Sequence, residues 1–165
     1  MTHLSRSLAL HLNQWLIVVL LALSVCGLAV SQTRKAPAPA AEEEPVFSDY
    51  RGVKIGWLSD EVRKKLGNPA DKGEEQDFYV FNEKETAQIL YDKTTRKVTA
   101  ISVDFSSGAS GVITPQQVFG ADIETKPDGS KYKLVRYPKA GYWISYSRTA
   151  GDTPIVTVTI QKMAQ

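Results

Sequence analysis

Histidine and cysteine, the residue types that most often carry catalysis or bind metals, occur only in the first 26 residues of the chain. The two histidines are His3 and His11, and the single cysteine is Cys26. The rest of the chain therefore lacks Ser-His and Cys-His nucleophile pairs, the usual zinc ligand sets and any disulfide framework. It also lacks the commonest general base near neutral pH. This composition predicts a protein that is not an enzyme and that holds no cofactor.

Carboxylates are the remaining candidates for chemistry, and five of them gather around a predicted strand, residues 78–81. They are Glu74, Glu75, Asp77, Glu83 and Glu85. Paired carboxylates can cleave glycosides or hold a hard cation such as calcium. Their spacing matches no EF-hand loop, and the chain has neither a P-loop nor a G-x-G-x-x-G fingerprint. We therefore interpret them as a solvated loop and turn, and predict no metal site.

Aromatic residues in the second half of the chain predict a protein-binding site instead. In the predicted strand 142–147, Trp143 has the opposite parity from the apolar residues on either side of it, so it points outward if they point into the core. We expect Tyr137, on the neighbouring strand, to join Trp143, with Lys133 beside them. Exposed Trp and Tyr side chains anchor many protein interfaces. The alternative, ordinary packing of Trp143 under a covered sheet face, stays open.

Two helix patterns organise the chain that carries these residues. Ser59 is expected to be the N-cap of a helix that ends at Gly67, and Pro69 prevents its continuation. Thr114 and Gln117 form a capping box at the start of a second, shorter helix. Helices of one or two turns are marginal alone, so both must pack against a sheet.

Short β-type segments follow each helix. The predicted strands are residues 78–81, 87–91, 98–105, 131–137, 142–147 and 155–161. Apolar and polar residues alternate most clearly around Ile101 and Val103. Consecutive strands joined by short turns form meanders. The sequence therefore predicts an α+β fold of two tandem repeats, residues 46–110 and 111–165, each a short helix followed by a three-stranded antiparallel meander.

The N-terminal residues 1–31 are predicted to direct the protein out of the cytoplasm. They contain an apolar run over residues 15–30, which favours a signal peptide cleaved before Gln32 or an uncleaved membrane anchor. A third alternative is lipidation at Cys26, because residues 23–26 resemble a bacterial lipobox. All three place the remaining chain outside the cytoplasm: in the periplasm, tethered at the envelope, or secreted.

Residues 32–45, rich in Ala, Pro and Glu, are expected to be an extended linker to the folded domain, residues 46–165. After residue 31 the chain carries 19 Lys and Arg against 18 Asp and Glu. Such a balance does not favour a general nucleic-acid binder. Membrane contact is expected only through the N-terminal segment, and the expected partner is a protein.

One stretch resembles a known family. Residues 52–69 follow the pattern G-x-x-x-G-x-x-S-x-x-V-x-x-x-L-G-x-P, and a strand segment DKTTRKVTAISVDF follows later. This pattern resembles the SmpA/OmlA family of bacterial outer-membrane assembly lipoproteins, the BamE-like domains. The matching residues are Gly52, Gly56, Ser59, Val62, Leu66, Gly67, Pro69, Val98 and Ile101. The likeness covers residues 50–105, and a weaker copy covers residues 111–162.

The resemblance implies a capped helix ahead of a small antiparallel sheet, and a non-enzymatic binding or assembly module of the cell envelope. The doubled helix-plus-meander plan is also similar to the tandem fold of β-lactamase-inhibitor proteins. That second likeness implies an alternative function, a secreted protein inhibitor that presents a sheet face to an enzyme. Both implications rest on fold analogy, which predicts architecture better than activity.

Overall fold

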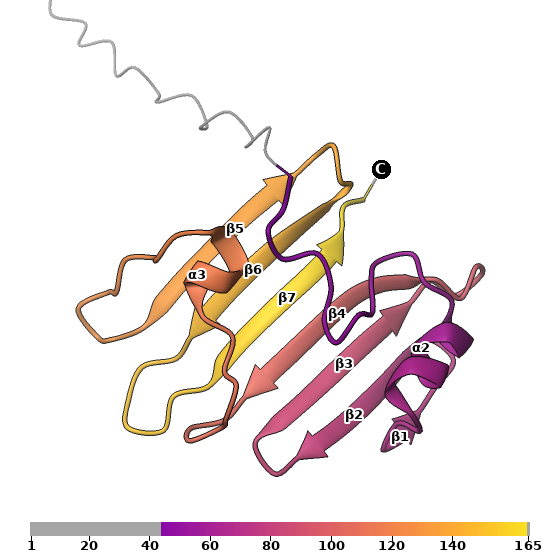
Figure 1. Ribbon diagram of the computed structural model, residues 1–165, viewed down its shortest axis with the longest axis horizontal. Helices are drawn as coiled ribbons and strands as arrows, with labels where there is room; N and C mark the ends of the chain where they lie inside the picture. Colours follow the sequence, from indigo (N-terminus) through magenta and orange to yellow (C-terminus); the bar gives the residue numbers. More distant parts are fainter. Residues whose placement is uncertain (1–43, 165) are drawn as a thin grey trace, which may run out of the picture. The chain divides into compact units, whose positions relative to one another are not determined.

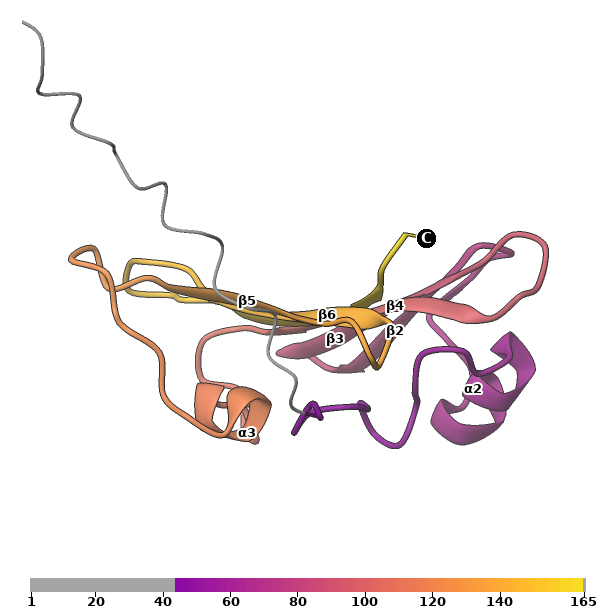
Figure 2. The same cartoon turned by 90° about the horizontal axis from the view of Figure 1, so that it is seen from above.

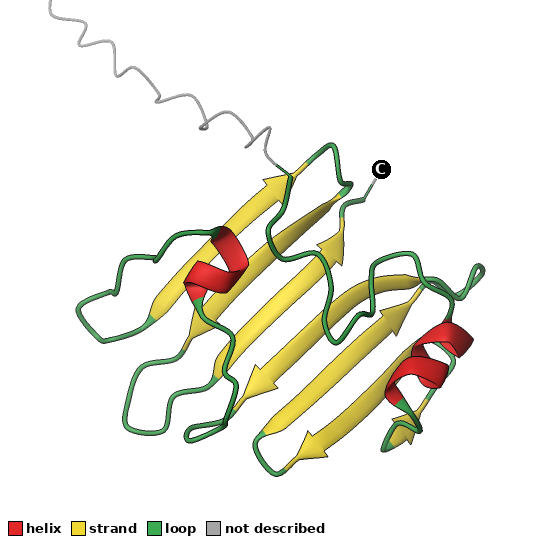
Figure 3. Cartoon of the chain, in the orientation of Figure 1, coloured by secondary structure: helices red, strands yellow, loops and turns green. Residues whose placement is uncertain are grey.

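The computed structural model describes residues 44–164, in which a sheet is the main element (Figures 1 and 3). The strands are β1 (Asp71–Lys72), β2 (Gln76–Asn82), β3 (Glu85–Tyr91), β4 (Val98–Phe105), β5 (Lys131–Tyr137), β6 (Tyr142–Arg148) and β7 (Val156–Lys162). The helices are α2 (Ser59–Leu66) and α3 (Pro115–Phe119). Within the described range, neither helix has the length and apolarity needed to cross a membrane. The predicted targeting segment and nearly all of the predicted linker lie outside these residues.

All seven strands pair antiparallel in one sheet, in the order β1-β2-β3-β4-β7-β6-β5. The predicted fold of two tandem repeats, each a helix with a three-stranded meander, is therefore wrong. β4 pairs with β7 from Ala100↔Gln161 to Phe105↔Val156, which makes a seam in the middle of a continuous sheet. Separate meanders would leave β4 and β7 as open edge strands, each with one row of unpaired backbone groups, and their mutual pairing satisfies both edges at once.

One face of the sheet carries the core. Figure 2 shows α2, α3 and the segment before α2 on the same side of the sheet, which we call the covered face. A row of fully buried isoleucines crosses its four central strands in register: Ile89, Ile101, Ile160 and Ile144. Apolar area removed from water stabilises a fold by about 25 cal/mol per Å². On the opposite side, which we call the open face, residues 44–164 place no helix.

Helix α2 is held against this face by its own side chains and by the β3–β4 hairpin. The predicted N-cap is off by one residue, because the helix begins at Ser59 and Leu58 precedes it. The Leu58 N–H donates to Glu61 Oε2 at 2.8 Å, and the Ser59 N–H donates to the Arg96 carbonyl at 3.0 Å. Val62 is fully buried under the helix. The backbone of the hairpin, which the sequence pattern does not include, thus takes part of the role assigned to the serine side chain.

Helix α3 follows the predicted chemistry. Thr114 is the N-cap, Pro115 occupies the first turn, and the Gln117 N–H donates to Thr114 Oγ1 at 3.3 Å. The Thr114 N–H in turn donates to Gln117 Oε1 at 2.8 Å, so the capping box is confirmed. Val118 is fully buried and joins the single turn to the core.

The two edges of the sheet differ in length. β1 is two residues long and covers one end of β2. β5 forms the other edge over seven residues, among them Lys131, Lys133 and Arg136. Thr125 makes an isolated bridge with Lys131 at the start of β5. Short edge strands and cations along an edge both discourage the addition of further strands.

Candidate protein-binding face

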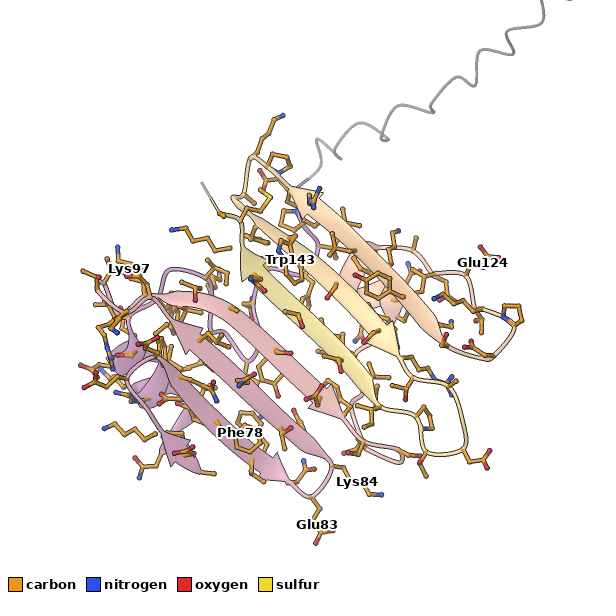
Figure 4. The ribbon with its side chains drawn as sticks, turned by 180° about the vertical axis from the view of Figure 1, so that it is seen from behind. Phe78, Glu83, Lys84, Lys97, Glu124 and Trp143 are labelled. Atoms are coloured by element: carbon orange, nitrogen blue, oxygen red, sulfur yellow. The ribbon has the colours of Figure 1, made fainter. Side chains whose placement is uncertain are left out.

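Figure 4 shows the open face, with Phe78 and Trp143 labelled. The register of the strands arranges its side chains in three rows from β2 to β5. The Ser102 row, in the middle, comprises Phe78, Gln88, Ser102, Thr159, Ser145 and Leu134. The Asp104 row comprises Val80, Thr86, Asp104, Thr157, Ser147 and Tyr132. The Trp143 row comprises Gln76, Leu90, Ala100, Gln161, Trp143 and Arg136.

Apolar side chains occupy both flanks of this face. The first flank, on β2 and β3, consists of Phe78, Val80 and Leu90; the second flank, on β5 and β6, consists of Tyr132, Leu134 and Trp143. Val80 is 53% exposed and Tyr132 is 57% exposed, whereas Phe78 and Trp143 are half-buried. Strands lie about 4.8 Å apart, so the outermost strands of the two flanks are separated by roughly 24 Å. Exposed apolar patches of this kind mark interaction sites.

Hydroxyl and amide side chains fill the centre of the face between the flanks. The Ser102 and Thr159 hydroxyls hydrogen-bond across the seam, with 3.0 Å between their oxygens. Thr157 Oγ1 donates to Asp104 Oδ1 at 2.6 Å. Asp104 and Arg136 are the charged residues in the three rows, so the rows as a whole are neutral. Ser, Thr, Tyr and Trp give adaptable hydrogen bonds and rigid contact area, the composition found in many protein-binding surfaces.

The structure separates the residues that the sequence groups together. Trp143 lies on the open face, as its parity predicts. Tyr137 pairs with Tyr142 and is buried on the covered face, and Lys133 also lies there, with its ammonium 4.8 Å from the centre of the Phe119 ring. The expected cluster of Trp143, Tyr137 and Lys133 is therefore not formed. Tyr137 and Lys133 pair with Tyr142 and Tyr146, which face the core, and not with Trp143.

Sequence reasoning overlooked most of the actual neighbours of Trp143. Arg136 lies directly opposite it on β5 and Gln161 on β7. The overlooked apolar residues of β5 are Tyr132 and Leu134. They have the opposite parity from Lys133 and Tyr137, so they lie on the open face. A one-residue change of register moves every side chain of a strand to the other face. The four-residue turn between Tyr137 and Tyr142 sets this register.

Comparison with protein-family models, with curated proteins and with solved structures finds no match. The chemistry and geometry of the open face therefore carry the functional proposal.

The carboxylates around β2 separate into two groups. Glu74, Glu75 and Glu83 are exposed, as the solvated-loop interpretation predicts. For Asp77 and Glu85 that interpretation is wrong, because both are buried. Between residues 44 and 164, no three or more His, Cys, Asp or Glu side chains are placed to hold a metal ion. The two buried carboxylates each accept hydrogen bonds from an arginine and a tyrosine of the same chain. Both therefore hold the fold together on the covered face.

Asp77 connects α2 to the sheet. Its Oδ2 lies 2.8 Å from Arg63 Nε, its Oδ1 lies 2.9 Å from Arg63 Nη2, and the Tyr91 hydroxyl donates to Oδ2 at 2.8 Å. Burial, and then the hydrogen bond to Asp77, raise the pKa of Tyr91. Burial also raises the pKa of Tyr79 to about 12, with a smaller contribution from the charge of Asp77. The Tyr79 hydroxyl itself has no hydrogen-bond partner among the described atoms.

Glu85 connects the segment before α2 to β3. It accepts hydrogen bonds from the Tyr50 hydroxyl, from Arg51 Nη2 at 2.8 Å and from Asn82 Nδ2 at 3.3 Å. Burial alone would raise the pKa of Glu85, but the hydrogen bonds from Tyr50 and Arg51 outweigh it. The pKa of this carboxyl in the folded chain is therefore lower than its ordinary value of 4.5.

This lowered pKa predicts an acid-sensitive contribution to stability. A carboxyl with a depressed pKa stabilises the fold above its unfolded pKa and loses that contribution as the pH falls through the folded pKa. We expect the free energy of unfolding to fall as the pH drops below about 4.5, and Glu85→Gln to make that fall shallower. Urea unfolding at a series of pH values measures both. Glu75→Gln, at an exposed pair with Lys93, is the matched control, and equal slopes for the two variants would contradict the assignment.

A cavity of about 590 Å³ lies at one end of the sheet, beside residues 97–99 and 162–164 and beyond the last pair of β4 with β7. Ile55, Val98 and Met163 line its apolar wall, and Lys97 and Lys162 are its cationic groups. Asp92, its acidic group, accepts hydrogen bonds from Thr94 and Thr95 within its own turn. The Thr95 hydroxyl also donates to Asp92 Oδ1 at 2.8 Å, so the groups around this carboxylate are those that hold the hairpin turn.

Proposed function

We propose that this chain is a non-enzymatic protein-binding and assembly module of the bacterial cell envelope. The observation that carries the proposal is the open face, where two apolar flanks surround a centre of mainly hydroxyl and amide side chains and the three rows carry no net charge. The partner docks on this face, and the helices on the covered face hold the sheet rigid behind it. Residues 1–31 export the domain or tether it, and membrane contact occurs only through that segment.

The sequence supports the envelope location independently of the open face. The apolar run over residues 15–30 and the Ala, Pro and Glu linker are typical of an exported domain held at a distance from a membrane or cleavage site. The resemblance to the SmpA/OmlA lipoproteins agrees with this location. Neutral rows on the open face favour a protein partner over nucleic acid, which requires a cationic surface.

A second candidate is a secreted inhibitor that covers an enzyme with the same open face. The uncovered sheet favours it, because a rigid sheet face can occlude an active site without chemistry of its own. The two functions differ in the partner: an envelope component for the assembly module, and a soluble hydrolase for the inhibitor.

Photo-cross-linking in intact cells tests the proposal. A photoreactive phenylalanine replaces Ser145, at the centre of the open face, and in a matched control it replaces Lys64, exposed on α2. We expect a heterologous adduct from position 145 and none from position 64, with an envelope protein as the captured chain. Trp143→Ala should weaken capture about 10-fold, since aromatic anchors dominate interface energy. Capture of a soluble hydrolase would favour the inhibitor, and equal adducts from both positions would contradict docking on this face.

A further inference from the structure

The open face is self-complementary about the β4–β7 seam. Its apolar flanks lie at equal distances on either side of that seam, and its hydroxyl and amide residues lie between them. A two-fold axis parallel to the strands, above the seam, places β2 of one copy over β5 of another, β3 over β6, and β4 over β7. In such an isologous interface every contact occurs twice, once on each side of the two-fold axis.

This operator matches side chains of like character across the interface. The apolar pairs are Phe78 with Leu134, Val80 with Tyr132, and Leu90 with Trp143 of the second copy. Packed sheets rotate by about 30° relative to each other because of their twist. Each flank extends over all three rows, so apolar contact persists under that rotation. The match follows from the register of the whole sheet.

The polar centre matches equally well under the same operator. Ser102 lies opposite Thr159, and Gln88 lies opposite Ser145. Hydroxyl groups both donate and accept, so each of these two facing pairs can form a hydrogen bond. Gln161 lies opposite Ala100 in the row at the other end of the face, where its amide can bond to water. Arg136 faces the neutral Gln76, so no cation meets another cation.

The one contact between like charges lies at the rim. Asp104 belongs to the row at one end of the face, and the operator brings its carboxylate close to the same residue of the second copy, beside Thr157. Like charges repel, although solvent screens such a pair at an interface rim. The face therefore favours a dimer that Asp104 weakens.

We propose that, when no other partner is bound, a second copy of this chain covers the open face. The inference deepens the proposed function and rests on it, because it concerns the same docking surface and predicts that the dimer competes with the partner. Stable interfaces involve about 20–30 residues per side. Three rows of six residues fall just short of that range, so the dimer is weak and a better-matched partner can displace it.

Sedimentation equilibrium of the full-length chain in density-matched detergent tests the proposal. We expect a monomer–dimer equilibrium within roughly 1 µM to 1 mM, the range of weak interfaces. Leu134→Lys should weaken it at least about 10-fold, because it places a cation in the second flank. Asp104→Asn should tighten it roughly 2- to 5-fold by removing the rim repulsion. Leu134 is 38% exposed on an edge strand, so the fold tolerates the change.

Two matched controls separate this contact from association elsewhere. Val46→Lys places the same charge at a residue that is 66% exposed outside the three rows, and Asp152→Asn removes an exposed acid from a loop. Neither should change the equilibrium. A monomer throughout the concentration range, or a dimer that ignores Leu134→Lys and Asp104→Asn, would overturn the self-association. If the chain is a monomer and position 145 still gives the heterologous adduct in cells, the self-association is overturned and the proposed function stands. If the chain forms a dimer with the expected variant responses and position 145 gives no heterologous adduct, the self-association is supported and the proposed function is overturned.

Discussion

Replacing Asp77 by alanine should lower the free energy of unfolding by about 3–5 kcal/mol, the cost of breaking a buried ion pair by removing one partner. Asp77 is fully buried, and the change leaves the guanidinium of Arg63 and the hydroxyl of Tyr91 without their acceptor. Because Arg63 belongs to α2, the helix also loses its anchor on β2. Urea unfolding followed by circular dichroism measures the change.

Two controls isolate the buried carboxylate in this experiment. Asp60 also faces Arg63, at 3.6 Å, but its side chain is 94% exposed, so Asp60→Ala should cost at most about 0.5 kcal/mol. Tyr79→Phe removes a buried hydroxyl that meets no hydrogen-bond partner within residues 44–164, so it should be neutral or slightly stabilising. Similar losses for Asp77→Ala and Asp60→Ala would show that the buried pair does not hold α2.

Replacing Ile160 by alanine should lower the free energy of unfolding by about 2–5 kcal/mol. The whole sheet should then unfold at a lower urea concentration. Ile160 is 1% exposed on β7, and it lies between Ile101 of β4 and Ile144 of β6. It therefore packs on both sides of the seam. Because β4 and β7 pair directly, a loss of packing at this position should destabilise both halves of the domain together.

Tryptophan fluorescence in single-tryptophan variants measures that coupling. Trp57 reports on the first half of the domain and Trp143 on the second, and both probes should give one coincident transition before and after the change. Ile155→Ala, at a residue 42% exposed beside the same strand, is the matched control and should cost less than about 1 kcal/mol. Two separated transitions would mean that the halves fold as independent repeats.

Local patterns predicted local structure well. The capping box of Thr114 and Gln117 placed α3, and the alternation around Ile101 placed β4, because short-range hydrogen bonding and side-chain parity decide both. The start of α2 was misplaced by one residue because its first N–H groups use Glu61 and the backbone of a distant hairpin. The N-cap preference of serine could not reveal that tertiary contact.

Long-range pairing could not be predicted in the same way. No property of β4 alone indicates that it pairs with β7, 51 residues or more further along the chain, so the sequence pattern is equally compatible with two separate repeats. The face of β5 depended on a register that one residue reverses, and this misplaced Tyr137 and Lys133. Asp77 and Glu85 look like surface acids until the arginines and tyrosines around them are brought together by the fold.

The unequal edges of the sheet determine how large an assembly this protein can build. An incoming strand finds only two residues at β1, and at β5 it meets Lys131, Lys133 and Arg136. Edge-to-edge growth is open-ended, and it is the route by which sheets extend into fibrils. Stacking through the open face about a two-fold axis instead closes after two copies, since each uses its only such face. Through the proposed dimer, the chain can thus associate reversibly without polymerising.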